Sequence, residues 1–172
     1  MKTEITLCFD FGNSRKKLAV FSNKKIIAER ILYTDTSGEI ETLLQEFKPQ
    51  KSILSSVINH NPGIEDTLKE KTHFHKLSVA TKLNFTAPVG KPETIGADRL
   101  AIAAAAVHFF PKKNNLVIGL GSCITYNFIS QQHEFLGGAI SPGMQMRFKA
   151  MHEFTAPGQT CKAGFYMEWP VN

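Results

Sequence analysis

The alternation of apolar and polar positions predicts strands before it predicts any helix. Three runs of strand type open the chain, Glu4 to Phe11, Lys17 to Ser22 and Lys25 to Leu32. Asn23-Lys24 separates the last two runs and is typical of a tight hairpin turn. A polar turn that contains a glycine joins the first two. The chain is therefore expected to begin with three neighbouring strands.

The next segments change between helical and strand spacing. They are, in order, a helix capped by Thr36 or Ser37 that runs to Phe47, a strand from Ser52 to Ile58, a helix opened by Pro62-Gly63, and a strand from Lys76 to Ala80. Three strands followed by helix, strand, helix and strand predict a mixed sheet with helices on its faces.

A loop from Thr86 to Thr94 and an alanine-rich helix from Ile95 to Phe110 follow. The polar segment Pro111 to Asn115 ends that helix and is the expected domain boundary, with residues 1–114 before it and 115–172 after it. The pattern then restarts. It predicts strands at Leu116 to Leu120, Cys123 to Ser130 and His133 to Ile140, a turn at Gly121-Ser122, and a helix from Pro142 to Phe154. The same beginning thus occurs twice, as a weak repeat of architecture. Residues 157–172 show no period.

Composition excludes several classes of protein. With 42% hydrophobic residues, the 172-residue chain has enough apolar side chains for a packed core, which excludes a wholly disordered protein. The formal net charge of +5 suits anionic ligands, but no arginine-rich stripe favours nucleic acid as a partner. The three cysteines have no metal-type spacing and suit a reduced compartment. No secretory leader or membrane-length apolar run is present, so a cytoplasmic protein is expected.

Asp10-Phe11-Gly12-Asn13-Ser14 follows the first strand and is composed like an anion-binding turn. Gly12 lets the backbone pass close to a ligand, and successive turn amides can face a phosphate. Asp10 could hold Mg²⁺ through water, and Lys17 could neutralise phosphate charge. An ordinary hairpin turn uses the same residue types, which leaves that alternative open. Gly119-Leu120-Gly121-Ser122 lies in the equivalent place of the second unit, so two turns are expected to face each other across a cleft.

Gly96-Ala97-Asp98-Arg99 begins the alanine-rich helix and places a carboxylate beside a guanidinium in the sequence. Asp98 could take the proton from a hydroxyl that attacks a phosphate, and Arg99 could bind a substrate carboxylate in bidentate fashion. An acid in the first turn is also a common way to stabilise a helix, which is the structural alternative. The chemical interpretation requires Asp98 to face the turn that begins at Asp10 across one shared cavity.

With these motifs the chain resembles the type III pantothenate kinases, which belong to the superfamily of actin, sugar kinases and Hsp70. The resemblance covers Thr6 to Ala156 and rests on three segments: Asp10 to Ser14 with Lys17, Pro92 to Leu100, and Gly137 to Gly143. It implies an α/β fold of the ribonuclease H-like, actin-like ATPase kind, a mixed sheet with flanking helices and an incomplete second domain. It also implies ATP-dependent phosphorylation of pantothenate to 4′-phosphopantothenate, the first step of coenzyme A biosynthesis, by a homodimer that needs Mg²⁺ and a monovalent cation, K⁺ or NH₄⁺.

The resemblance also assigns roles to residues. Those implied to contact ATP are Asp10, Phe11, Gly12, Asn13, Ser14, Arg15, Lys16, Lys17 and Ser122, with Asp10 also implied as the metal ligand. Those implied to border pantothenate are Val89, Gly96, Ala97, Asp98 and Arg99, with Asp98 as the general base.

Three departures from the family pattern make enzymatic activity of this chain less expected. Gly119 stands where the family has the aspartate that holds the monovalent cation, and Val89 stands where it has a tyrosine that contacts pantothenate. Family members also continue well past Asn172, so the unpatterned tail is interpreted as a premature, frame-shifted ending. Half a nucleotide domain is expected to bind ATP weakly and to leave apolar surface exposed, so activity of this short copy is in doubt.

Two alternative functions remain. One is a non-catalytic relative that acts as a regulatory or transcriptional accessory protein, which the two lost side chains favour. The other is a kinase of the same superfamily that phosphorylates a sugar or an acetyl group, against which the Gly-Ala-Asp-Arg motif argues.

Overall fold

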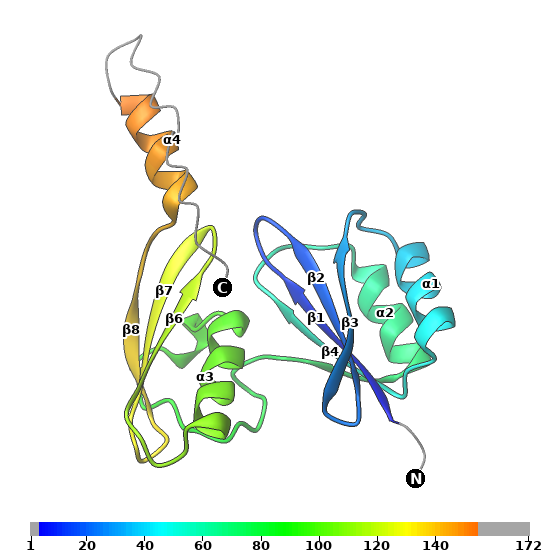
Figure 1. The fold of residues 1–172 in the computed structure, drawn as a ribbon, viewed down its shortest axis with the longest axis horizontal. Helices are drawn as coiled ribbons and strands as arrows, with labels where there is room; N and C mark the ends of the chain where they lie inside the picture. The colour runs from blue at the N-terminus through cyan, green and yellow to red at the C-terminus, as the bar shows by residue number, and fades with distance from the viewer. Residues whose placement is uncertain (1–3, 155–172) are drawn as a thin grey trace, which may run out of the picture.

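The computed structural model describes residues 4–154 and begins with a mixed five-stranded sheet in the order β3-β2-β1-β4-β5 (Figure 1). Its strands are β1 (Ile5–Phe11), β2 (Lys16–Ser22), β3 (Lys25–Leu32), β4 (Lys51–Ser56) and β5 (His73–Lys76). β1, β2 and β3 are antiparallel neighbours, whereas β4 is parallel to β1 and β5 is parallel to β4. The expected mixed sheet and the expected order of strands and helices are confirmed.

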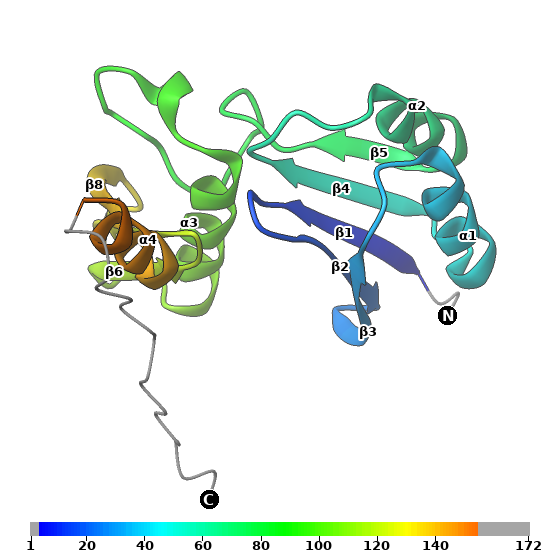
Figure 2. The same ribbon diagram turned by 90° about the horizontal axis from the view of Figure 1, so that it is seen from above.

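One face of this sheet packs against helices α1 (Ser37–Phe47) and α2 (Pro62–Lys71), which lie on the same side of it (Figures 1 and 2). Both helices start at side-chain caps: Thr36 accepts a hydrogen bond from the Glu39 amide, and Asn61 accepts one from the Gly63 amide. Alternate strand residues share this face and form the first hydrophobic core with the helices: Leu7, Phe9, Phe11, Leu18, Val20, Leu32, Ile40, Leu43, Leu54, Ile64 and Leu68. Neither α1 nor α2 covers the opposite face of the sheet, and the candidate site described below lies on that face.

The second part consists of a short 3₁₀ helix η1 (Pro92–Thr94), helix α3 (Ala97–Phe109), strands β6 (Asn115–Leu120), β7 (Cys123–Ile129) and β8 (Phe135–Pro142), and helix α4 (Met144–Phe154). The three strands form an antiparallel sheet in the order β6-β7-β8. Side chains of α3 and of this sheet form a second hydrophobic core together with the segment before the helix: Leu77, Phe85, Ile95, Leu100, Ala103, Ala106, Val107, Ile129 and Phe135.

Helix α3 therefore packs with the strands that follow it, although the expected division after residue 114 groups it with the strands before it. The reason is its small, apolar surface, whose alanines can pack closely on a three-stranded sheet. The polar segment Pro111 to Asn115 is a short helix-to-strand connection within this packing unit. The division into domains 1–114 and 115–172 remains a prediction.

Several strand bounds differ from those expected, and β4 ends at Ser56 and not at Ile58. β5 covers His73–Lys76 and not Lys76 to Ala80, because Leu77 leaves the sheet and is buried in the second core. β8 starts at Phe135 and not at His133, because His133 has a φ of +64° and its amide donates to the Ser130 carbonyl in a turn.

The outer face of the second sheet, away from α3, carries an uncovered row of apolar side chains. Leu116, Ile118 and Leu120 on β6 are 61%, 49% and 81% exposed, and Phe128, the register partner of Leu116 on β7, is 40% exposed. The expected apolar surface is therefore present. Between residues 4 and 154, every helix is too short or too polar to cross a lipid bilayer.

Candidate active site between the first sheet and helix α3

A cavity of about 710 Å³ lies between the open face of the first sheet and helix α3, which stands opposite β1 and β4 in Figure 2. Its polar side chains include Asp10, Lys17, Ser55 and Asp98. The apolar part of the wall includes Cys8, Ile53, Leu77, Ala101 and Ile102. The shared cavity that the chemical interpretation requires for Asp10 and Asp98 is thus present.

Asp10 is the next-to-last residue of β1 and pairs in register with Lys17 on β2. The Lys17 Nζ lies 3.3 Å from Asp10 Oδ2, and the Asp10 side chain is 47% exposed. Such an exposed ion pair is weak, so both groups can exchange partners when a charged ligand arrives. Mg²⁺ is commonly held by one or two carboxylates together with waters and substrate phosphates, and Asp10 fits that donor set. Within residues 4–154 no three His, Cys, Asp or Glu side chains form a protein-only metal site.

Asp98 lies in the first turn of α3, after the N-cap residue Gly96, and is partly buried. Within residues 4–154, its carboxylate takes part in no hydrogen bond and in no ion pair. A carboxylate that faces a cavity without a fixed partner is available to accept a proton. Beside it, burial raises the pKa of the Cys8 thiol, so this cysteine stays neutral.

The rest of the phosphate turn borders a different cavity, of about 540 Å³, which Gly12, Asn13, Ser14, Arg15 and Lys16 line. Phe11 is fully buried in the first core, so only its backbone is available to a ligand. The residues of the phosphate turn therefore border two cavities. Alternate strand residues point to opposite faces of the sheet, so Asp10 and Lys17 line the cavity that contains Asp98. The residues from Gly12 to Lys16 line the other cavity.

The two glycine-containing turns meet. Ser14 Oγ in the first turn and Ser122 Oγ in the second are 2.6 Å apart and share a hydrogen bond. The two turns thus lie together, but their serine side chains are in direct contact, whereas a cleft between the turns was expected. Two hydroxyl groups, one from each turn, thus lie at one place, whereas the Gly12 and Gly121 amides donate to the Arg15 and Cys123 carbonyls within their own turns.

Arg99 points away from this cavity. Its Nε donates to Asn127 Oδ1 at 2.6 Å, and its guanidinium carbon lies 5.5 Å from the centre of the Phe135 ring. Gly138 makes room for it, because a Cβ at that position would overlap the Tyr126 carbonyl and lie 2.8 Å from Arg99 Nη2. Adjacent helix residues point about 100° apart. The sequence neighbours Asp98 and Arg99 are consequently not side by side in the cavity.

Comparison with known proteins identifies the family. The family model described as type III pantothenate kinase matches residues 6–163. The chain belongs to the type III pantothenate kinase family. It is 41% identical over 154 residues to a type III pantothenate kinase from Christiangramia forsetii, covering 88% of this chain and 63% of that protein. It is 35% identical to one from Flavobacterium johnsoniae, covering 87% of this chain and 62% of the relative.

A solved structure described as a Baf family transcriptional activator from Campylobacter jejuni is also similar. It has a TM-score of 0.50 and 27% identity, over 88% of this chain and 61% of that one. The chain thus spans about 63% of the length of the curated relatives it matches.

The residues around Gly119 show whether this chain fits the monovalent cation that the family resemblance implies. Gly119 faces α3, and a Cβ there would lie 2.7 Å from Thr125 Oγ1 and 3.5 Å from Ile102 Cδ1. Thr125 is buried and accepts a hydrogen bond from Asn127, the residue that also binds Arg99. Thr125 and Ile102 thus fill the space of the family's aspartate, and the residues present do not fit a monovalent cation held in that way.

Val89, the other departure, is partly buried against the second core and is not part of the cavity wall. Both departures therefore fall on residues that pack on α3 or its core. The family's usual side chains are replaced there by packing contacts.

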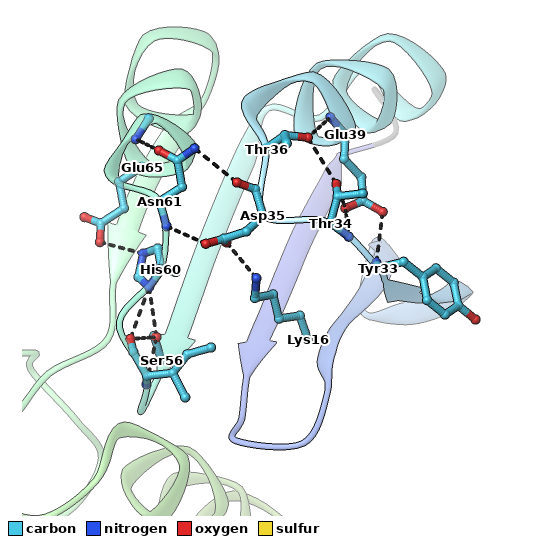
Figure 3. Close-up of polar contacts among 12 residues, drawn as sticks. Lys16, Tyr33, Thr34, Asp35, Thr36, Glu39, Ser56, His60, Asn61 and Glu65 are labelled. Atoms are coloured by element: carbon cyan, nitrogen blue, oxygen red, sulfur yellow. Dashed lines mark hydrogen bonds and ion pairs between the residues drawn. The ribbon is translucent and has the colours of Figure 1, made fainter.

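The sequence patterns missed a polar cluster beside the phosphate turn (Figure 3). Asp35, between β3 and α1, accepts a 2.7 Å hydrogen bond from Lys16 Nζ and one of 2.9 Å from the Asn61 amide. The hydrogen bond from Lys16 lowers the pKa of Asp35, although burial opposes it. Lys16 is therefore held by a structural partner. Sequence patterns could not find these contacts, because both partners of Asp35 are distant in the chain. The only signal was an acid between a strand and a helix cap.

A second acid in the same region, Glu65 on α2, binds His60 at 3.1 Å and Lys76 at 2.6 Å. Burial alone would raise the pKa of Glu65, but the hydrogen bond and charge of Lys76, together with His60, outweigh burial and lower it. These contacts fix the start of α2 against the ends of β4 and β5.

Proposed function

We propose that the cavity between β1 and α3 is the site of phosphoryl transfer from ATP to the hydroxyl of pantothenate, the first step of coenzyme A biosynthesis. The observation that supports this proposal is that Asp10, Lys17 and Asp98, which come from three elements, line one cavity. Membership of the type III pantothenate kinase family supplies the substrate class.

Each side chain then has a role. The amides of Asn13 and Ser14 and the hydroxyl of Ser122 bind the phosphates, since the Gly12 amide already donates to the Arg15 carbonyl. Asp10 would hold hydrated Mg²⁺, which would neutralise charge on the phosphates. Lys17 moves from Asp10 to a phosphate oxygen. Asp98 takes the proton of the pantothenate hydroxyl as its oxygen bonds to the γ-phosphorus, and ADP leaves with the electron pair of the broken P–O bond.

We place this activity in the cytoplasm and in a homodimer, in line with the family. The contact between Arg99 and Asn127 makes Arg99 a support for the wall rather than a group held ready for substrate. No step depends on a monovalent cation at Gly119, because Thr125 fills that space.

An assay of phosphopantothenate formation from ATP, Mg²⁺ and pantothenate tests the proposal. Asp98→Asn should lower the turnover rate about 10²- to 10⁴-fold, since it removes the proton acceptor. Its melting temperature should fall only slightly, because the carboxylate has no side-chain partner within residues 4–154 and contributes only its favourable charge in the first turn of α3. Glu93→Gln, an exposed acid on η1 near the same helix, is the matched control and should retain full activity. Absence of turnover by the unmodified chain, or equal rates for both variants, would refute the proposal.

The accessory-protein alternative has one observation in its favour: the similar Campylobacter jejuni chain is described as a transcriptional activator. A titration with duplex DNA at several salt concentrations tests it. Sequence-preferring binding, together with no turnover of pantothenate, would support this second function.

A further inference from the structure

Ser55 on β4 is a buried hydroxyl that the family motifs do not include. The residue is 8% exposed, and its Oγ has no hydrogen-bond partner among the residues that the structure describes. Buried polar side-chain atoms in native proteins nearly always have a partner, in protein or in water, so an exception calls for an explanation.

The direction of this side chain follows from strand alternation. Ser52 and Leu54 point to the helix-covered face, where Ser52 Oγ bonds Thr72 Oγ1 at 2.6 Å and Leu54 is in the first core. Ile53 and Ser55 therefore point to the opposite face, and both line the cavity shared with Asp98. The unpartnered hydroxyl thus belongs to the cavity side of the sheet.

Its neighbours define what it can bind. Ser55 is the register partner of Asp10 on the adjacent parallel strand, and Asp98 lies across the cavity on α3. An anionic group placed between these two carboxylates would be repelled, whereas a neutral hydroxyl can donate to a carboxylate and accept from a serine. Lys17, a cation in the same wall, lies one strand further from β4, beyond β1.

We infer that Ser55 is a substrate-binding residue whose Oγ–H donates a hydrogen bond to the hydroxyl oxygen of the phosphoryl acceptor. That oxygen can donate its own proton to Asp98 at the same time and retains a lone pair for attack. Ser55 thereby fixes the orientation of the acceptor between Asp98 and the phosphate turn. This inference rests on the proposed function, because it takes the acceptor to be an alcohol such as pantothenate.

Two serines of the same strand provide the experiment. Ser55→Ala and Ser52→Ala each remove one buried hydroxyl from β4, on opposite faces of the sheet. The affinities of the full chain and of both variants for pantothenate and for ATP with Mg²⁺ are measured separately by titration calorimetry. Their melting temperatures are measured without ligand.

Ser55→Ala should weaken pantothenate binding about five- to tenfold, the effect of losing one neutral hydrogen bond, and should leave ATP binding unchanged. Its melting temperature without ligand should be unchanged or higher, since an unsatisfied buried group is removed. Ser52→Ala should show the reverse, a lower melting temperature and normal pantothenate affinity, because it breaks the contact with Thr72.

Equal pantothenate affinity in Ser55→Ala and the unmodified chain would overturn the inference and leave the proposed function standing. A melting temperature for Ser55→Ala as low as that of Ser52→Ala would also overturn it, since the hydroxyl would then have a structural partner. If the unmodified chain binds ATP but not pantothenate, the acceptor itself is wrong, and the proposed function fails together with the inference.

Discussion

At the scale of single residues, small side chains decide where the charged ones go. Gly138 allows the Arg99 guanidinium to approach the β8 backbone, and Gly119 leaves space that the Thr125 hydroxyl occupies. Arg99, Asn127 and Thr125 thus form a buried polar chain behind α3. Asp98, one residue before Arg99, is left as the acid of α3 that faces the cavity.

A substitution at Gly119 tests this packing. Gly119→Asp restores the family's aspartate, but we expect it to lower the stability by about 1–3 kcal/mol, because its Cβ displaces Thr125 and its charge is partly buried. Gly121→Asp is the control, since a Cβ there makes only an ordinary 3.6 Å contact with the Cys123 carbonyl. Chemical denaturation measures both. A gain in stability or activity in K⁺ for Gly119→Asp would show that the cation site can be rebuilt.

At the scale of elements, the loop between β3 and α1 ties three elements together. Asp35 in this loop binds Lys16 of β2 through one carboxylate oxygen and the N-cap residue of α2, Asn61, through the other. Asn61 in turn donates its side-chain amide to the Asp35 carbonyl. Asp35 thus helps to fix the start of α2 against β2, together with the contacts that Glu65 makes with His60 and Lys76.

The pH dependence of stability follows from that contact. The pKa of Asp35 is lowered in the folded chain, so its ion pair stabilises the fold above the ordinary value of 3.8 and this contribution is lost as the pH falls through the lower folded pKa. Asp35→Asn should therefore lower the melting temperature at pH 7 by roughly 2–5 °C, a modest effect because the pair is partly exposed.

The difference between Asp35→Asn and the unmodified chain should shrink as the pH falls below about 4, which melting curves at several pH values will show. Asp66→Asn is the control, because its side chain is 75% exposed and lies 3.5 Å from Lys69. A difference between the chain and Asp35→Asn that is constant from pH 3 to 7 would contradict the assignment.

At the scale of the whole molecule, the two sheets differ in how their outer faces are covered: α1 and α2 cover the first sheet on the side away from the cavity, whereas none of the described helices covers the outer face of the second sheet. The outer face of the second sheet carries Leu116, Ile118, Leu120 and Phe128 in the open. Relatives of this chain are longer, since it spans 63% of the Christiangramia forsetii protein. Apolar patches of this kind promote association.

We therefore expect the chain to associate with itself as its concentration rises, with Ile118 inside the contact. Ile118→Lys should raise the concentration at which association is half complete by about tenfold, the effect of losing one buried isoleucine. Val79→Lys is the control, because Val79 is similarly exposed at 42% but lies outside that face. Sedimentation at several concentrations measures the shift, and equal midpoints for both variants would contradict it.

The sequence by itself determined the local elements and the identity of the two acids. Strand alternation and helical spacing depend on neighbouring residues, so the first three strands and the cap at Thr36 could be predicted. The same locality explains why Asp10 and Asp98 could be singled out, since each stands at the end or start of a regular element.

Only the tertiary structure decided what those acids face. The burial of Leu77, which ends β5, the contact of Lys16 with Asp35 and the turn of Arg99 toward Asn127 each join residues that are far apart in the chain. The missing partner of Ser55 is likewise a property of the assembled sheet and helix. Local patterns carry no information on such contacts, because which distant group fills a given space depends on how the sheets and helices are arranged in three dimensions.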